Sequence, residues 1–326
     1  MSQTSKVSVC IPTYNRAQYL RESIESVLMQ SFSDFELIIC DNASVDDTRE
    51  VVNSFCDDRI SYYRNPENLG AFKNINLCLK LAKGEYITIF HDDDVMLQDN
   101  LLVKVNFLEM HPNIGMVGSN TYIIDGYGKT TGLCWEEFIE RNLIDEGKGY
   151  FKKIFLGNNV FCFPAVLCRR KCYQELGEFE EIPYCDWEMW MRISLFYDLA
   201  YVQKPLIKYR IHDGNDHLNY IGFKEEYKAK MFIVNKYASK IPEVESLECD
   251  MQTNICRRIV GYSFSNLSCN HKSMNMFFLL IAFSISINSI SSITYIFSQL
   301  LGFIRGKIRF KQRIKFFLDK VTKNHA

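Results

Sequence analysis

Three adjacent aspartates, Asp92, Asp93 and Asp94, are the residues of this sequence best suited to chemistry. They follow the apolar stretch 86–90, which is typical of a buried strand. Neighbouring carboxylates repel one another unless a cation lies among them, and Mg²⁺ and Mn²⁺ prefer such hard oxygen ligands. The triplet therefore predicts a divalent-metal site that holds substrate phosphates. A solvated loop with a helix-capping aspartate is the alternative that this motif alone leaves open.

Three other polar segments stand where apolar stretches end, at residues 12–16, 41–44 and 64–70. In an open parallel sheet, the turns that follow the strands share one edge, and ligands bind at that edge. Four polar turns in succession therefore predict a binding site. The sequence lacks both G-x-G-x-x-G and G-x-x-x-x-G-K-[ST], which argues against a plain dinucleotide or Walker-type site.

The elements that position these turns alternate along the first 120 residues. This alternation predicts an α/β fold with a mainly parallel, Rossmann-like sheet flanked by helices. A helix at 187–197 and an exposed helix at 223–240 are expected later in the chain, and Ser44 is the expected N-cap of the second helix. The predicted strands are 7–11, 35–40, 60–63, 86–90 and 114–117, and the predicted helices between them are 17–29, 46–55, 71–81 and 98–110.

The motifs Val7–Asn15, Ile38–Thr48, Asn68–Gly70 and Asp92–Asp94 together resemble those of the family 2 glycosyltransferases. The resemblance extends to about residue 215. It implies the GT-A fold and an inverting transfer of a sugar from a nucleoside-diphosphate sugar, UDP- or dTDP-linked. We expect a nucleotide-sugar-binding half at 1–120, an acceptor-binding half at 121–222, and a helical, partly amphipathic C-terminal extension at 223–326.

The resemblance assigns the nucleotide to the turns at the sheet edge. Asp41 would accept a hydrogen bond from the pyrimidine N3–H, although an Asx-turn would also explain an aspartate there. Lys73 would reach a phosphate or simply face solvent. The residues implied in nucleotide binding are Pro12, Thr13, Tyr14, Asn15, Asp41, Asn68, Gly70, Lys73 and Asp92.

The resemblance also implies a divalent cofactor, Mn²⁺ or Mg²⁺. Asp93 is the first choice of ligand, with Asp94 beside it and His212 from the segment Tyr209-Arg210-Ile211-His212. His212 could instead bind the diphosphate or be a structural residue. His91 departs from the family pattern Asp-x-Asp-Asp by replacing its first aspartate. The ranking of the three aspartates stays open.

A second segment, 183–192, resembles the Glu-Asp motif of the family, with Cys185 in place of the glutamate. An attacking hydroxyl must lose a proton, and a nearby carboxylate can take it. Asp186 is therefore the implied catalytic base, with an N-cap role as the alternative; Glu188 is the second choice because it can pair with Arg192. The segment also suggests Trp187 at the acceptor, although core packing would explain it equally well. The resemblance places Arg210 at the leaving group and Arg169 at a lipid-linked diphosphate or in solvent.

Charge is unevenly distributed along the 326 residues. The net charge is −1, whereas the segment from Arg305 to Ala326 holds eight Lys/Arg and one Asp, so the rest carries −8 (−1 minus +7). Residues 273–304 contain no charged side chain, which suits interfacial helices more than one clean bilayer span. We expect a cytoplasmic protein without a signal peptide. Its basic tail is expected to contact the inner membrane, where a lipid-linked glycan of polysaccharide or O-antigen synthesis is the acceptor. An ordinary helical subdomain that completes the core is the alternative.

Other classes remain open on the sequence alone. A sugar-phosphate nucleotidyltransferase has a glycine-rich basic loop after its first strand, where this chain has Pro-Thr-Tyr-Asn. A non-catalytic nucleotide-sugar-binding protein would not need the acidic triplet or Asp186. No nucleic-acid reader motif accompanies the basic tail. The twelve scattered cysteines contain no C-x-x-C pair, which favours buried thiols over zinc or disulfides.

Overall fold

A computed structural model describes residues 5–134, 143–145, 147–157, 159–215 and 223–265. The chain forms two compact units, Met1–Ile233 and Val234–Ala326. The first unit contains the whole sheet. Of the second unit, the structure describes the last residues of α8 (Phe223–Tyr237) and the helix α9 (Pro242–Ser265).

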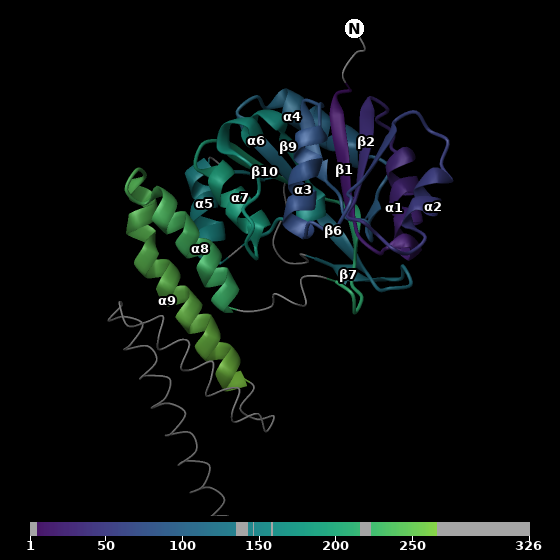
Figure 1. The fold of residues 1–326 in the computed structure, drawn as a ribbon. Coiled ribbons are helices and arrows are strands. Elements are labelled where there is room, and N and C mark those ends of the chain that lie inside the picture. Colours follow the sequence, from purple (N-terminus) through teal and green to yellow (C-terminus); the bar gives the residue numbers. More distant parts are fainter. Residues whose placement is uncertain (1–4, 135–142, 146, 158, 216–222, 266–326) are drawn as a thin grey trace, which may run out of the picture. The chain divides into compact units, whose positions relative to one another are not determined.

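Four parallel strands form the first part of the sheet, in the order β3-β2-β1-β4. The helices between them are amphipathic, because apolar residues recur at helical spacing on one side of each. Figure 1 shows α1 and α2 next to each other beside these strands. The elements are β1 (Val7–Thr13), α1 (Ala17–Leu28), β2 (Phe35–Asp41), α2 (Thr48–Asn53), β3 (Ile60–Arg64), α3 (Ala71–Leu81) and β4 (Tyr86–Ile89).

The rest of the sheet is mixed. Strand β9 lies antiparallel between β4 and β6, and β10 runs parallel to β6 and antiparallel to β5 and β8. The strands are β5 (Val95–Met96), β6 (Ile114–Ile124), β7 (Thr130–Leu133), β8 (Leu143–Asp145), β9 (Val166–Arg169) and β10 (Asp198–Arg210). The helices are α4 (Asn100–Met110), α5 (Gly147–Phe155), the short 3₁₀ helix η1 (Phe163–Ala165), α6 (Arg170–Leu176) and α7 (Cys185–Ser194).

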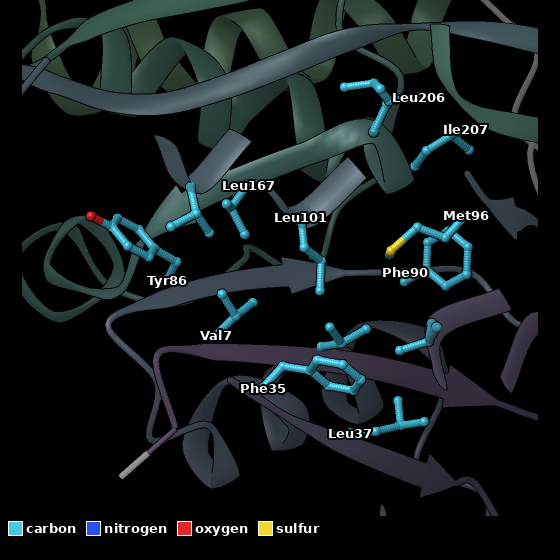
Figure 2. Packing of buried hydrophobic residues seen from close by; sticks show 14 of the residues in the cluster. Val7, Phe35, Leu37, Tyr86, Phe90, Met96, Leu101, Leu167, Leu206 and Ile207 are labelled. Carbon is cyan, nitrogen blue, oxygen red and sulfur yellow. The ribbon is translucent and has the colours of Figure 1, made fainter. Parts of the chain in front are cut away.

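The core lies on both faces of the central strands, which explains why β1 and β2 are apolar along most of their length. Val9 and Leu37 are paired across the two strands, and both are 0% exposed. Figure 2 shows side chains from β1, β2 and β4 together with Leu101 of α4 and Leu206 of β10. The parallel and mixed parts of the sheet therefore share one core, and truncation of such a side chain to alanine costs about 2–5 kcal/mol.

The predicted strands and helices of the first 120 residues are all present, most of them within a few residues at each end. β6 continues to Ile124, seven residues beyond the predicted end, and the short strand β5 was not predicted. Two details were wrong. Ser44 does not cap α2, which begins at Thr48; its Oγ instead accepts a hydrogen bond from the N–H of Asn15 (2.9 Å). The helix after residue 223 is not exposed on all sides, because Ala229 and Ile233 of α8 are buried.

The predicted division at 120/121 falls inside β6, and the division at 222/223 falls where α8 begins. The uncharged stretch 273–304 and the basic tail lie outside the described residues. Among the residues that the structure does describe, no helix is both long and apolar enough to cross a membrane.

Candidate active site

The register of the parallel strands brings three of the polar turns to one edge of the sheet. Thr13 pairs with Asp41, and Asp41 pairs with Arg64, each as the last residue of its strand. The fourth turn, which carries the acidic triplet, follows β4 on the other side of β1. The arrangement predicted from the sequence is therefore present.

The first two turns are tied to one another through Asn15. Its backbone is left-handed (φ 52°), a conformation that asparagine tolerates better than most residues. Its side-chain Oδ1 accepts a hydrogen bond from the N–H of Val45 (2.8 Å). Pro12 and Thr13 lie in the strand just before this turn, and Tyr14 is 44% exposed beside it. A flat ring can stack on such a tyrosine.

The second and third turns are joined by asparagine side chains. Asn42 donates to Asn68 Oδ1 (2.8 Å), and its own Oδ1 accepts from the N–H of Leu69 (2.8 Å). Gly70, with a left-handed φ of 85°, donates its N–H to Asn68 Oδ1 (2.8 Å). Lys73 is exposed in the first turn of α3. These contacts hold the third turn against the second.

Asp41 is fully buried, and both of its carboxylate oxygens have partners. Oδ1 accepts from the N–H of Ser44 (2.8 Å), and Oδ2 accepts from the Tyr62 hydroxyl (2.6 Å) and lies 3.4 Å from Arg64 Nε. Burial and the hydrogen bond to Asp41 raise the pKa of Tyr62 to about 12. The Asx-type contact is thus present, and the Arg64 and Tyr62 side chains occupy the second carboxylate oxygen.

The acidic triplet is buried, with exposures of 8%, 7% and 0% for Asp92, Asp93 and Asp94. Burial and the neighbouring Asp93 charge raise the pKa of Asp92 to about 7. Burial also raises the pKa of Asp94 to about 6, although His91, whose Nδ1 lies 3.5 Å from Asp94 Oδ2, opposes the shift. A cation placed among these groups would favour their ionised forms.

The triplet and His91 offer a set of ligand atoms for that cation. One atom each from His91, Asp93 and Asp94 lies within 4.8 Å of the others. Asp94 Oδ1 accepts from the N–H of Arg210 (2.8 Å), but Asp94 Oδ2 is buried without a hydrogen bond in the described structure. An unsatisfied buried oxygen facing an imidazole fits a divalent cation of the Mn²⁺ type.

His212 lies at the same cluster, as predicted. Its Nε2 is 3.0 Å from Asp93 Oδ2, and Asn215 donates to the same oxygen (3.1 Å). The imidazole packs against Tyr19 of α1, with ring centroids 4.8 Å apart. The loop after β10 therefore holds Asp93 from one side.

Arg210 is only 2% exposed, and every nitrogen of its guanidinium has a protein partner. Nε donates to the Asp93 carbonyl (2.7 Å), one terminal nitrogen binds Glu22 (2.5 Å), and the other reaches the carbonyls of Asp125 and Gly126 (3.3 and 3.4 Å). Arg210 thus links the acidic turn to α1 and to the β6–β7 turn. These contacts alone account for the buried guanidinium, without the predicted contact with a leaving group.

Helix α7 carries the predicted base. Asp186 lies half-buried in its first turn, directly after Tyr184 and Cys185, and Tyr184 has a strained left-handed backbone (φ 59°). Burial raises the pKa of Asp186 to about 6, while backbone N–H groups and the charge of His91 oppose the shift. A carboxyl group with this pKa is suited to accept a proton near neutral pH.

The neighbours of Asp186 have other contacts. Glu188 is fully buried and binds Arg192 through two hydrogen bonds (2.9 and 2.5 Å), so its carboxylate is committed to a structural pair. Trp187 is half-buried; it meets the Tyr184 ring edge-on (5.2 Å), and Lys230 Nζ lies 5.7 Å from its centroid. Of the two acidic residues, Asp186 is the better placed to act as a base.

Arg169 lies away from this edge. It pairs with Tyr86, the first residue of β4, whereas the acidic triplet follows the other end of that strand. Its guanidinium donates to the carbonyls of Ile114 (2.8 Å) and Leu108 (2.7 Å). The structure does not bring Arg169 to the site, and the side chain neither faces solvent nor reaches a place for a diphosphate there.

Sequence reasoning missed three residues that shape the site. His91 was noted only as a departure from a family pattern, although an imidazole beside carboxylates is itself a signal for metal binding. Asn215 and Glu22 had no such signal, because their roles depend on contacts with Asp93 and Arg210 that join distant parts of the chain.

Comparisons with known proteins agree with this geometry. The family model "Glycosyl transferase family 2" matches residues 8–177. EpsE of Bacillus subtilis, assigned as a glycosyltransferase, is 30% identical over 199 residues, which cover 59% of this chain and 68% of EpsE. Among solved structures, S. aureus TarS 1–349 in complex with UDP-GlcNAc has a TM-score of 0.66 at 19% identity, over 85% of this chain and 79% of that chain.

A second solved structure, the mannosyltransferase PcManGT of Pyrobaculum calidifontis in complex with GDP-Man and Mn²⁺, has a TM-score of 0.55 at 15% identity. The match covers 92% of this chain and 85% of that chain. At these identities the likeness concerns the fold, and it confirms the expected GT-A architecture of a mainly parallel sheet flanked by helices.

Proposed function

Because the chain belongs to the family 2 glycosyltransferases, we propose that it moves a sugar from a UDP- or dTDP-linked donor to a hydroxyl group of a glycan acceptor. The observation that carries this proposal is the placement of two acidic groups around His91. The buried triplet lies on one side, at the strand edge, and the Asp186 carboxyl lies near enough for the His91 charge to lower its pKa.

The donor nucleotide is proposed to lie across the first three turns. Tyr14 offers an exposed ring for the base, and the Asn68–Gly70 turn borders the ribose and phosphates. The complexes of TarS with UDP-GlcNAc and of PcManGT with GDP-Man support a nucleotide-sugar donor. The partners of Asp41 make Arg64 the side chain that must rearrange when the base binds.

Asp93 and Asp94 are the residues proposed to hold a divalent cation, Mn²⁺ or Mg²⁺, beside the donor diphosphate. When bound, such a cation neutralises charge on the departing nucleoside diphosphate. The buried, unsatisfied Asp94 Oδ2 supports this assignment. Asp92, next to Thr13 in the site, is proposed to contact the ribose or donor sugar.

Asp186 is proposed to take the proton of the acceptor hydroxyl. The acceptor oxygen then forms a bond to the anomeric carbon, and the bond from that carbon to the diphosphate oxygen breaks with its electron pair. Attack from the face opposite the diphosphate inverts the configuration, and no covalent enzyme intermediate is needed. Trp187, adjacent in α7, is proposed to border the acceptor.

A panel of nucleoside-diphosphate sugars tests this function. With one of them, the protein is expected to release a nucleoside diphosphate, and excess EDTA is expected to stop the release. Production of pyrophosphate instead would identify a nucleotidyltransferase. Nucleotide binding without turnover of any donor, in the presence of varied glycan acceptors, would identify a binding protein.

We further propose that the acceptor is lipid-linked and that the basic tail contacts the cytoplasmic face of a membrane. The support is compositional: eight Lys/Arg against one Asp after residue 304 favour anionic headgroups. A full-length variant with Lys307 and Lys311 changed to glutamine is expected to sediment less with phosphatidylglycerol vesicles. The matched variant with Lys171 and Lys204 changed removes the same charge from the body and is expected to sediment like the wild type.

A further inference from the structure

We propose that two buried polar side chains, Lys104 of α4 and Asn76 of α3, are positioning residues for Asp186. They hold the backbone that carries an aromatic cluster, and this cluster packs α7 in its place. The inference rests on the proposed role of Asp186 as the base. The aromatic cluster consists of the rings of Phe163, Phe179 and Trp190.

The aromatic cluster joins α7 to two short segments of backbone. Trp190 of α7 meets Phe163 of η1 edge-on, with ring centroids 5.9 Å apart, and meets Phe179 edge-on at 6.1 Å. Such contacts stabilise an aromatic pair beyond the area that it buries. Trp190 is 1% exposed, and its Nε1 has no hydrogen bond among the described residues. Packing against the two phenylalanine rings, which are 5.2 Å apart, therefore orients Trp190.

Asp186 lies four residues before Trp190 in α7. Residues four apart are neighbours on one face of a helix, so the cluster packs next to the helical turn that carries the base. Phe163 also meets the ring of His91 edge-on, at 5.5 Å, which brings the cluster up to the turn after β4. A displacement of the cluster would therefore move Asp186 relative to a donor bound at that turn.

Lys104 holds the first backbone segment. Its side chain is 1% exposed, and its Nζ donates to the carbonyl of Ala165 at 2.7 Å. Ala165 is the last residue of η1, a single 3₁₀ turn with few hydrogen bonds of its own. Burial lowers the pKa of Lys104 to about 7. An apolar residue would pack in this core without the cost of burying an amine, so the hydrogen bond to η1 is what a lysine adds here.

Asn76 holds the second backbone segment through two hydrogen bonds to Phe179. Its Nδ2 donates to the Phe179 carbonyl (2.8 Å), and its Oδ1 accepts from the Phe179 N–H (3.0 Å). Phe179 is buried between α6 and α7, where the backbone has no helix or strand to satisfy these groups. Lys104 and Asn76 thus come from helices within residues 1–120 and hold backbone within residues 121–222.

The test compares Lys104→Met and Asn76→Leu with a matched control from each helix, Val105→Ala and Ile75→Ala. The test variants keep the approximate side-chain volume and remove the hydrogen bonds. The controls remove apolar atoms from side chains that are 3% and 9% exposed, which costs stability. Steady-state kinetics use the full-length protein and the nucleoside-diphosphate sugar that the wild type turns over, and urea unfolding measures stability.

Both test variants should lower kcat roughly 10–100-fold, because a displacement of about 1 Å at reacting groups has effects of this size. KM for the donor should stay near its wild-type value, because the lost hydrogen bonds are with Ala165 and Phe179 and not with the nucleotide-binding turns. The controls should lose stability and keep the wild-type kcat. Lys104→Gln, whose shorter side chain can still donate, should recover part of the loss.

A double variant tests whether the two residues act through one cluster. If they do, the loss of kcat in Lys104→Met with Asn76→Leu should be smaller than the product of the single losses. Losses that multiply would show that the two side chains act separately, and would overturn the shared cluster. If Lys104→Met does not fold by circular dichroism, Asn76→Leu decides the question alone, because it acts on the same rings.

Wild-type kcat in a test variant, while Asp186→Asn is inactive, would overturn the inference for that residue and leave the proposed function standing. A fall in kcat that the controls match at equal loss of stability would overturn it as well, because stability alone would then explain the effect. A wild type that transfers no sugar from any donor would overturn the inference together with the proposed function.

Discussion

The two ends of the central sheet treat charge in opposite ways. At the amino end, Lys6 binds Glu85 (2.6 Å) and Glu109 (2.8 Å), and the Tyr86 hydroxyl donates to Glu109 (2.7 Å). The hydrogen bond from Lys6, followed by that from Tyr86, lowers the pKa of Glu109. Lys6, Glu85 and Glu109 therefore each have an opposite charge beside them.

At the carboxyl end, burial raises the pKa of Asp92, Asp94 and Asp186, and Asp94 Oδ2 has no hydrogen bond in the described part of the chain. A buried charge without compensation costs stability. Its presence is explained if a cation or substrate completes it, because proteins accept such costs at functional sites. The carboxyl end therefore differs from the amino end in these three carboxyl groups, whose ionisation the protein disfavours, while Asp41 and Arg210 at the same end have partners for their charges.

Substitution of Asp186, at the carboxyl end of the sheet, is expected to have the largest effect on transfer activity. Asp186→Asn should lower transfer on the order of 10³-fold, because the amide cannot take the acceptor proton. Nucleotide binding, measured by calorimetry, should be unchanged. The matched change at the other end, Glu85→Gln, should leave transfer intact. Full activity in Asp186→Asn would refute its assignment as the base.

Arg210→Lys should have the next largest effect, because a lysine cannot bind Glu22 and the Asp93 carbonyl together as the guanidinium does. The acidic turn would be held less firmly, and Mn²⁺ affinity should fall roughly 10–100-fold. Mn²⁺ titration measures this directly. Glu22→Gln retains a hydrogen-bond acceptor and should show a smaller loss. Unchanged affinity in Arg210→Lys would mean that the site does not depend on this linkage.

The pKa of Asp186, raised at the carboxyl end of the sheet, predicts a pH dependence of turnover. A base must be deprotonated to act, and burial raises the pKa of this carboxyl to about 6. Turnover should therefore fall about tenfold for each pH unit below that value and level off above it. A rate profile with saturating donor reports this step. An acid limb near pH 4, where an ordinary aspartate titrates, would contradict the assignment.

The smallest effect is expected at the amino end. Glu109→Gln should destabilise the protein by less than about 1 kcal/mol, since the pair with Lys6 is partly exposed. The pKa of Glu109 is lowered in the folded state, so its contribution is present above the unfolded pKa and is lost as the pH falls through the folded pKa. Urea unfolding of both proteins at neutral and acidic pH measures the difference, and transfer activity should not change.

The sequence by itself determined the parallel half of the molecule and the location of its polar turns. Strands such as Val7–Thr13 and Phe35–Asp41 are visible because a strand buried on both faces is a short continuous apolar run, which is a local property. The pairing of Glu188 with Arg192 could also be foreseen, since residues four apart are neighbours on one face of a helix.

Only the tertiary structure decided what the later residues do. Arg210 and Glu22 are separated by 188 residues, and no local pattern indicates that they meet. Arg169 pairs with Tyr86 at the amino end of β4, whereas Asp93 follows the carboxyl end of that strand. The antiparallel register of β9 against β4 therefore keeps the two residues apart. His212 contacts Asp93 across 119 residues of sequence, which no local pattern indicates either. Long-range register and hydrogen-bond partners arise from packing, which is why residue types could predict the chemistry of the site but not the role of each side chain in it.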